Sequence, residues 1–201
     1  MGRTALAIVS LSAFALGGCT ALGLTCENGW WDDCDGAAIE DAYWDTKSEV
    51  SQFNTAIANV PTDGTATYDG YAQMVPYYGA IQGKRVHSEV HLDVNFDTSS
   101  ASGTMTNFYT LARRVNGSVT IENGAISGNQ VTADLSGSVY GNTFIGANTG
   151  SATVDGSLSG RFRGDSAEGL YLGVNIDLTY ADGVYGSMDG GAYLLNTTST
   201  P

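Results

Sequence analysis

The two histidines are the side chains in this sequence best suited to bind a metal ion or to transfer protons near neutral pH. His87 and His91 stand four positions apart in a stretch that alternates apolar and polar residues. On a strand this spacing places both on one face but about 13 Å apart, too far for one metal ion or one hydrogen bond. We therefore interpret both as solvated strand residues. We expect no metal site, no cofactor and no catalytic group, so the protein is not expected to be an enzyme.

Cys19 closes a segment with the composition of an export signal. The chain begins with a short basic start, and the apolar run from Ala5 to Leu16 is shorter than the roughly 20 residues that span a bilayer. The next residues, Leu16-Gly17-Gly18-Cys19, resemble the lipobox of bacterial lipoproteins, in which cleavage precedes a lipidated cysteine. The resemblance implies a signal peptide over residues 1–18 and a lipid anchor at Cys19. An ordinary signal peptide with an incidental cysteine is the alternative.

Lipidation of Cys19 would leave Cys26 and Cys34 as a pair in an exported chain. In an oxidising compartment we expect them to form a disulfide that closes a short acidic and aromatic loop. Zinc binding is the competing interpretation, but two thiols with no nearby histidine form a poor ligand set. The loop contains Trp30 and Trp31, which either pack onto the domain as a cap or form an exposed ligand-binding contact.

Composition limits both the partners and the fold. The 201 residues include 21 Asp or Glu and 8 Lys or Arg, a net charge of −13, and this argues against nucleic acid because its binding needs clustered basic groups. Glycine occurs 27 times, and Gly, Ser, Thr and Asn are interleaved with Val, Tyr and Phe. This mixture is typical of short strands joined by tight turns and disfavours long helices.

Hydrophobic spacing predicts one helix followed by strands. Apolar residues from Ile39 to Val60 recur at steps near 3.6, which predicts one amphipathic helix that stops before Pro61. Beyond a turn at residues 62–64 the period becomes two, with one face apolar and the other polar. The alternating stretches are Thr65–Tyr71, Val86–Phe96, Thr104–Phe108, Val119–Ile121, Val131–Leu135, Ala152–Phe162, Leu170–Tyr180 and Val184–Leu194.

About eight strands joined mainly by hairpin turns predict an all-β fold, an antiparallel up-and-down barrel preceded by one amphipathic helix. Strands of this length also suit a transmembrane barrel, whose apolar face would point outward. Three features favour an inward apolar face. A lipid anchor would be redundant on a membrane-spanning barrel, Gly156 and Gly160 suit a tapering interior, and the helix needs an apolar surface, which the barrel mouth would supply.

Several strands resemble the β-barrel domain of transferrin-binding protein B. Gly64–Tyr71, preceded by a helix and a proline, resembles the opening strand of that domain, and Leu92–Phe96 with Ser102–Phe108 resembles a strand pair. Gly160–Gly169 is similar to its late hairpin, although the family often has a Gly-Gly pair where this chain has a single glycine before Leu170. The similarity covers residues 60–194. Transferrin-binding protein B has two lobes, each with a handle domain, whereas this chain has one barrel and a helix in front.

The resemblance implies a single-barrel bacterial surface lipoprotein that binds a ligand. The expected ligand is a protein or an iron-related solute, held by loops at one barrel end. The expected location is the outer membrane, with the lipid anchor in the membrane and the barrel exposed at the surface or facing the periplasm. The alternative is a lipocalin-like carrier with a small apolar ligand inside the barrel, which a cavity of roughly several hundred Å³ would indicate.

The segment Met74–Gly79 is expected to be an aromatic loop between the first two strands. Tyr77 and Tyr78 in it are candidate ligand-binding residues, because tyrosine buries a large area at low cost in side-chain entropy. A loop folded over the barrel end is the equal alternative. The expected organisation is a signal peptide (1–18), a lipidated tether with a disulfide loop (19–36), a helix and linker (37–62), a barrel (63–195) and a polar tail (196–201).

Overall fold

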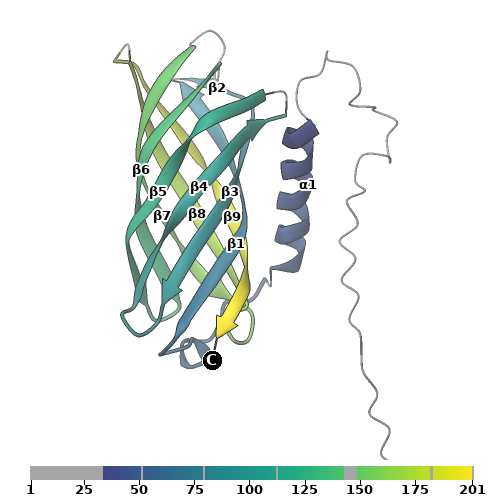
Figure 1. Cartoon of the computed structure of the whole chain (residues 1–201), viewed down its shortest axis with the longest axis vertical. Coiled ribbons are helices and arrows are strands. Elements are labelled where there is room, and N and C mark those ends of the chain that lie inside the picture. The colour runs from purple at the N-terminus through teal and green to yellow at the C-terminus, as the bar shows by residue number, and fades with distance from the viewer. Residues whose placement is uncertain are drawn as a thin grey trace, which may run out of the picture.

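A helix precedes a barrel of long strands (Figure 1). The computed structural model describes residues 34–50, 52–78, 80–111, 113–142, 149–181 and 183–200. Helix α1 (Cys34–Glu49) and the short 3-10 helix η1 (Ile57–Asn59) come first. The strands that follow are β1 (Thr65–Tyr78), β2 (Ile81–Gln82), β3 (Val86–Asn95), β4 (Ser100–Thr110), β5 (Arg113–Ser127), β6 (Gln130–Asn142), β7 (Thr149–Arg163), β8 (Gly169–Tyr180) and β9 (Tyr185–Thr200).

The eight long strands form a closed antiparallel barrel. β1 pairs with β3, each later strand pairs with the next, and β9 returns to pair with β1, for example Tyr71 with Tyr193. The short β2 is an extra strand at the end of β1, where Gln82 pairs with Tyr77. The predicted up-and-down barrel of about eight strands, preceded by one helix, is confirmed.

The apolar face of each strand points into the barrel. In β8 every even-numbered residue across Leu170–Tyr180 is buried, whereas outward positions such as Asn175 and Asp177 are exposed. The inward side chains form one continuous core that includes the fully buried rings of Tyr68 and Phe162. The alternative in which the apolar face points outward is therefore wrong for this barrel.

Gly156 and Gly160 were expected to suit a tapering barrel interior. In the structure they let the neighbouring strand β8 approach closely. A Cβ on Gly160 would collide with the main-chain carbonyl oxygen of Tyr171 in β8, and a Cβ on Gly156 would collide with that of Asn175. Only glycine lacks the atom that would make these contacts. The two residues thus allow β8 to coil tightly over β7.

Helix α1 ends earlier than the periodicity predicted. It stops at Glu49, and beyond it the side chains of Phe53 and Ile57, expected on the apolar helix face, are 81% and 68% exposed. The main chain of this segment pairs with the end of β7 instead, and the Thr55 N–H donates to the Phe162 carbonyl at 2.9 Å. A main-chain group used in this pairing is not available to extend the helix.

The sequence had suggested that helix α1 covers the barrel mouth. Helix α1 instead lies along the outer wall of the barrel (Figure 1). It contacts β1, β3, β4 and β9. Its buried residues recur every three or four positions, namely Gly36, Ile39, Tyr43 and Thr46. A Cβ on Gly36 would lie 2.6 Å from the carbonyl oxygen of Thr110, so this glycine lets the helix approach the wall closely. Neither helix in the described ranges is long and apolar enough to cross a membrane.

Two strands extend into segments that were expected to be irregular. β1 continues through Tyr78, so the predicted loop over Met74–Gly79 is wrong as far as that residue, and Met74 is fully buried in the core. β9 continues to Thr200, so the residues expected as a polar tail pair with β1. Both extensions are stabilised by pairing between the two ends of the barrel sequence, which local periodicity does not reveal.

Candidate binding surface

Most of the sequence-predicted site residues fall outside the described residues. Cys19, Cys26, Trp30 and Trp31 precede residue 34, and Cys34 begins α1 with a side chain that also lies outside the description. Lipidation of Cys19, the disulfide between Cys26 and Cys34, and the ligand contact of the two tryptophans therefore stay predictions.

Tyr77 and Tyr78 end β1 at the rim of the barrel. Both side chains are half-buried. The ring of Tyr78 packs against the core and meets the ring of Tyr180, the last residue of β8, edge-on with centroids 6.2 Å apart. The two tyrosines are thus fixed on a strand end, and their role in ligand binding stays a prediction.

Four strand connections gather at the barrel end that contains Tyr78, and we call it the hairpin end (Figure 1). They join β1 to β3, β4 to β5, β6 to β7 and β8 to β9. At or beside each connection lies one exposed large apolar side chain: Ile81 (59%), Leu111 (57%), Tyr140 (59%) and Tyr185 (74%). The four side chains are thus distributed around the rim of this end, and exposed large apolar side chains can serve as contacts for a partner.

The opposite end, which we call the connector end, has a different surface. Its turns join β3 to β4, β5 to β6 and β7 to β8, and the connector, residues 52–60, packs against it. The apolar side chains of these turns, Phe96 and Ala167, are buried. Within the described part of the chain, exposed large apolar groups at this end occur only in the connector, at Phe53 and Ile57.

The four exposed residues of the hairpin end were not among the sequence candidates. The sequence pattern that could have identified them is a large apolar residue on the polar face of a strand, beside a turn. In β6 the buried residues Val131, Leu135 and Val139 are odd-numbered, so Tyr140 points outward. Tyr185 precedes the inward-facing Met188 by an odd number of positions, so it also points outward. This parity rule would have found two of the four.

Basic side chains accompany the apolar ones at the hairpin end. Lys84 and Arg85 precede β3 and are exposed. Arg114, near the start of β5, is exposed with its Cζ 5.9 Å from the ring centroid of Tyr109, and its Nη2 donates to Asn107 Oδ1 at 3.3 Å. The chain has only 8 Lys or Arg residues, so this end differs from the acidic remainder. It offers a ligand both apolar contacts and partners for acidic groups.

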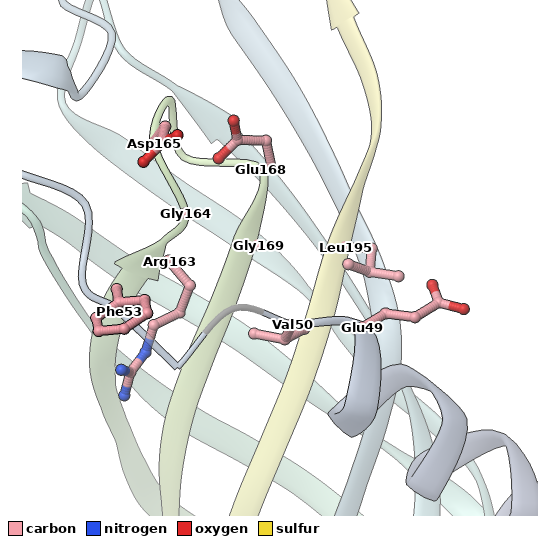
Figure 2. A pocket seen from close by; sticks show the side chains of 9 residues that line it. All are labelled: Glu49, Val50, Phe53, Arg163, Gly164, Asp165, Glu168, Gly169 and Leu195. Carbon is pink, nitrogen blue, oxygen red and sulfur yellow. The ribbon is translucent and has the colours of Figure 1, made fainter.

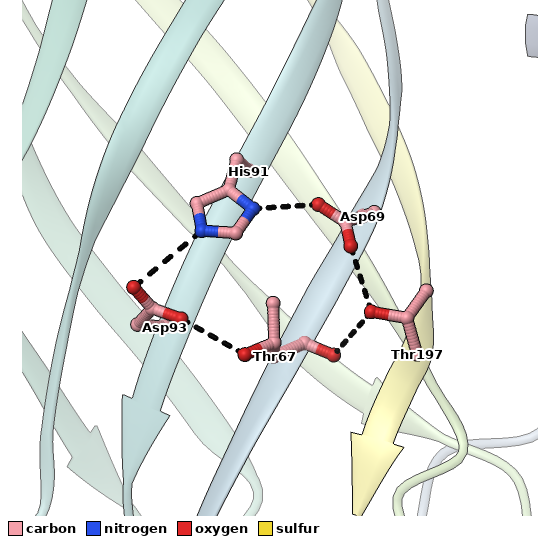
Figure 3. Close-up of polar contacts among 5 residues, drawn as sticks. All are labelled: Thr67, Asp69, His91, Asp93 and Thr197. Atoms are coloured by element: carbon pink, nitrogen blue, oxygen red, sulfur yellow. Dashed lines mark hydrogen bonds and ion pairs between the residues drawn. The ribbon is translucent and has the colours of Figure 1, made fainter.

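A polar cluster on the outer wall links β1, β3 and β9 (Figure 3). His91 Nδ1 lies 2.6 Å from Asp69 Oδ1, and His91 Nε2 lies 3.5 Å from Asp93 Oδ2. Thr67 donates to Asp93 at 2.9 Å, and Thr197 donates to Asp69 at 2.7 Å. The cluster thus joins the first, second and last long strands of the barrel.

The charges of this cluster shift the pKa of both its central groups. The hydrogen bond that His91 donates to Asp69 raises the pKa of His91 against the opposing effect of partial burial, and Asp93 adds to the rise. Burial would raise the pKa of Asp69, but hydrogen bonds from Thr197 and His91 lower it overall. In the described part of the chain, no group of three or more His, Cys, Asp or Glu side chains could hold a metal ion.

His87 is completely buried, so the prediction that it is a solvated residue is wrong. Helix α1 covers it, with the ring of Tyr43 5.8 Å from the imidazole. Gln73 Nε2 lies 2.8 Å from His87 Nε2, so we assign the proton of the neutral ring to Nδ1, which has no hydrogen-bond partner. Burial lowers the pKa of His87, Glu40 opposes the shift and Arg85 adds to it.

Lys47 contacts aromatic rings of both α1 and the barrel wall. Its Nζ lies 4.5 Å from the ring centroid of Trp44, 5.5 Å from that of Tyr193 on β9 and 5.9 Å from that of Tyr43. Tyr193 in turn contacts the tilted ring of Tyr171 of β8, with centroids 4.9 Å apart. Burial, with Tyr193 as a neighbour, raises the pKa of Tyr43 to about 12, so the phenol stays neutral. The arrangement stabilises the docked helix.

Two hollows lie beside α1 on the outside of the barrel. One, of about 390 Å³, is bounded by the end of the helix, the connector and the β7–β8 turn (Figure 2). The other, of about 300 Å³, is bounded by Thr46 and residues of β1, β3 and β4. The barrel interior is filled by one cluster of side chains in which Leu92 and Met105 are buried. This filling disfavours the lipocalin-like alternative, which requires an internal cavity.

Residues 60–187 match the family described as the C-lobe and N-lobe β-barrels of Tf-binding protein B. This range is more than half of the chain and extends from the end of the connector into β9. No curated protein matches the sequence.

Solved structures of transferrin binding protein B are similar to this chain. A double mutant from Haemophilus parasuis Hp5 is 20% identical, with a TM-score of 0.49, over 73% of this chain and 28% of that one. Intact Ap-TbpB, with its N and C lobes, is 19% identical, with a TM-score of 0.46, over 72% and 29%. The isotype 1 protein from serogroup B Neisseria meningitidis is 20% identical, with a TM-score of 0.44, over 70% and 28%. The chain thus spans less than a third of the length of each.

Proposed function

The chain belongs to the family of transferrin-binding protein B β-barrels, and we propose on this basis that it is a lipid-anchored binding protein that holds a protein partner at the hairpin end. The similar proteins are named for binding transferrin, which makes binding, and not catalysis, the expected activity. Transferrin is the first partner to test, and an iron-related solute is the second kind of ligand.

The observation that supports the hairpin end is its set of four exposed apolar side chains, Ile81, Leu111, Tyr140 and Tyr185. A few large apolar or aromatic anchors contribute most of the affinity of a protein interface. Because Ile81, Tyr140 and Tyr185 lie on strands of one sheet and Leu111 directly follows β4, the barrel fixes the main-chain position of each anchor. Such pre-organisation lowers the entropy lost on binding.

The predicted tether is compatible with a hairpin end that faces away from the membrane. Gly36 in the first turn of α1 lies against Thr110 at the hairpin end, so the chain that precedes the helix joins the barrel there. Residues 20–33 could extend to about 50 Å from a lipidated Cys19, at about 3.5 Å per residue. That reach leaves the hairpin end free to face away from the membrane. Trp30 and Trp31, a few residues before α1, are proposed as further contacts to the same partner.

Photo-cross-linking in cells that make the protein tests the proposed surface. Benzoylphenylalanine replaces Ile81, Tyr140 or Tyr185, one at a time, and replaces Asp155 or Asp177 on the outer wall as matched exposed controls. We expect one protein, identified by mass spectrometry, to be attached at the hairpin positions and not at the wall. Equal products at both sets of positions, or none at the hairpin positions, would contradict the proposal.

The anchor has its own test. A Cys19→Ser variant removes the thiol that the lipid would modify, and we expect the protein to move from the membrane fraction to the released fraction. Several acyl chains at about 0.8 kcal/mol per buried methylene give stable anchoring, so the change should be nearly complete. Membrane association that is unchanged in Cys19→Ser contradicts the anchor and leaves the proposed binding surface unaffected.

A further inference from the structure

We propose that the connector end has a second docking surface, which binds a basic amphipathic segment of another protein. The surface is the hollow of about 390 Å³ between the end of α1, the connector and the β7–β8 turn (Figure 2). It lies at the opposite end of the barrel from the hairpin end. The inference therefore does not depend on the function proposed there.

The hollow has an apolar side made of Val50, Phe53 and Leu195. Val50 is buried, Leu195 is half-buried, and Phe53 is among the most exposed large apolar residues described. The position of Phe53 is fixed by its main chain, because Gly164 N–H donates to the Phe53 carbonyl at 3.1 Å. Covering Phe53 removes a large apolar side chain from water, and no main-chain order has to be gained for it.

The rim of the hollow is acidic. Glu49, Asp165 and Glu168 line it, and all three are exposed. Figure 2 shows Asp165 and Glu168 on the β7–β8 turn at one edge and Glu49 beside Leu195 at another. One Glu168 oxygen accepts the Ser166 N–H at 2.9 Å, so the carboxylate is held in position by the turn.

The one basic residue that lines the hollow does not neutralise this rim. Arg163 Nη1 donates to the Gln52 carbonyl at 2.8 Å, and Arg163 Cζ lies 5.3 Å from the ring centroid of Tyr171. Its guanidinium is thus engaged by the connector and by an aromatic face. Three carboxylates against one occupied cation leave the hollow with a net negative charge.

Size and charge together define the occupant. A volume of about 390 Å³ falls within the range of roughly 300–1,000 Å³ that is usual for ligand pockets, and it can receive one large apolar side chain. Lysine or arginine on either side of that side chain would face the three carboxylates. The net charge of −13 favours approach of a basic segment and disfavours an anionic membrane surface. The occupant is therefore a protein segment with one apolar residue flanked by basic residues.

Selection from a random peptide display library on the immobilised Cys19→Ser protein tests this inference. The hollow variant combines Phe53→Ser, Glu49→Gln and Asp165→Asn. The control variant combines Ile81→Ser, Asp155→Asn and Asp177→Asn, which likewise remove one exposed apolar side chain and two negative charges, at the hairpin end and on the outer wall. Thermal unfolding of each variant establishes that it is folded before its binding is compared.

We expect the enriched peptides to carry an apolar residue flanked by Lys or Arg. They should bind the control variant like the unchanged protein and should bind the hollow variant about tenfold more weakly. Their binding should also weaken as salt screens the rim charges. Enrichment of neutral or acidic peptides, equal loss on both variants, or no enrichment would overturn the inference. Because the control variant changes Ile81, any selected peptides that bind at the hairpin end would be recognised by their weaker binding to that variant.

Discussion

Asp69 Oδ1 lies 2.6 Å from His91 Nδ1 and joins the first barrel strand to the second across the outer wall. Thr197 of the last strand donates to the other oxygen of the same carboxylate at 2.7 Å. One aspartate therefore links three strands at the seam where the barrel closes. A charged His91 strengthens this link, so the seam should respond to pH.

Replacing His91 with glutamine is expected to destabilise the protein at low pH only. The pKa of His91 is raised in the folded state, so its stabilising effect is complete below the unfolded value of about 6.5 and is lost as pH rises through the folded value. We expect His91→Gln to lower the free energy of unfolding by up to about 1 kcal/mol at pH 5.5, since both partners are half-exposed and screened, and to change nothing at pH 9. Urea unfolding at the two pH values measures the difference. A loss that is equal at both would show that the charge of His91 is irrelevant.

The pKa values of the two histidines are shifted in opposite directions, so their stabilising effects are expected in opposite pH ranges. Burial lowers the pKa of His87, so its stabilising contribution is present above the unfolded value of about 6.5 and is lost as pH falls through the folded value. Since α1 covers His87, acidification should loosen the helix. We expect the main-chain amides of α1 to lose hydrogen-exchange protection between pH 7 and pH 5, after correction for intrinsic exchange. His87→Gln, which retains an acceptor for Gln73, should remove the pH dependence; protection that falls equally in this variant contradicts the role of His87.

Gly160→Ala is expected to destabilise the barrel by about 1–3 kcal/mol, because the new Cβ would collide with the main chain of Tyr171. Gly150→Ala, in the same strand, is the matched control. A Cβ on Gly150 meets nothing within 4 Å, so this variant should stay within about 0.5 kcal/mol of the unchanged protein. Denaturant unfolding compares the two. Similar losses in both would mean that glycine serves strand flexibility here and not close approach.

Lys47→Met is expected to weaken the docking of α1 by about 0.5–1 kcal/mol, since methionine keeps an unbranched apolar chain but loses the cation above Trp44 and Tyr193. Hydrogen exchange of the helix amides should become roughly two- to fivefold faster, while the barrel strands stay unchanged. Lys84→Met, at an exposed position near the hairpin end, provides the control for loss of one charge. If the two variants behave alike, the aromatic contacts of Lys47 do not stabilise the helix.

Much of the barrel could be predicted because its strands follow a local rule. The even residues of β8 face the core as their alternation indicates, and the same holds for β3 from Val90 to Val94. Each long strand pairs with the next long strand in the sequence, so order in the sequence becomes order in the sheet. The resemblance to the family rests on the same segments and was found from them.

The parts that could not be predicted depend on contacts distant in sequence. Phe53 has helical spacing, but main-chain pairing with β7 ends the helix before it. Met74 and Tyr78 lack alternation signals strong enough to extend β1, and pairing with β9 supplies the missing stability. His87 has the polar parity of an exposed residue and is buried only because α1 folds back across β3. Tertiary packing overrides local pattern at each of these places.

The most direct test of the proposed function is the affinity of the partner identified by cross-linking for two variants of the purified protein, one changed at each barrel end. One variant changes Ile81, Leu111, Tyr140 and Tyr185 of the hairpin end to serine. The other changes Phe53 and Ile57 of the connector end to serine. We expect the hairpin-end variant to bind at least about a hundredfold more weakly, as loss of several interface anchors implies, and the connector-end variant to bind normally. Unchanged affinity in the hairpin-end variant would contradict the proposed function.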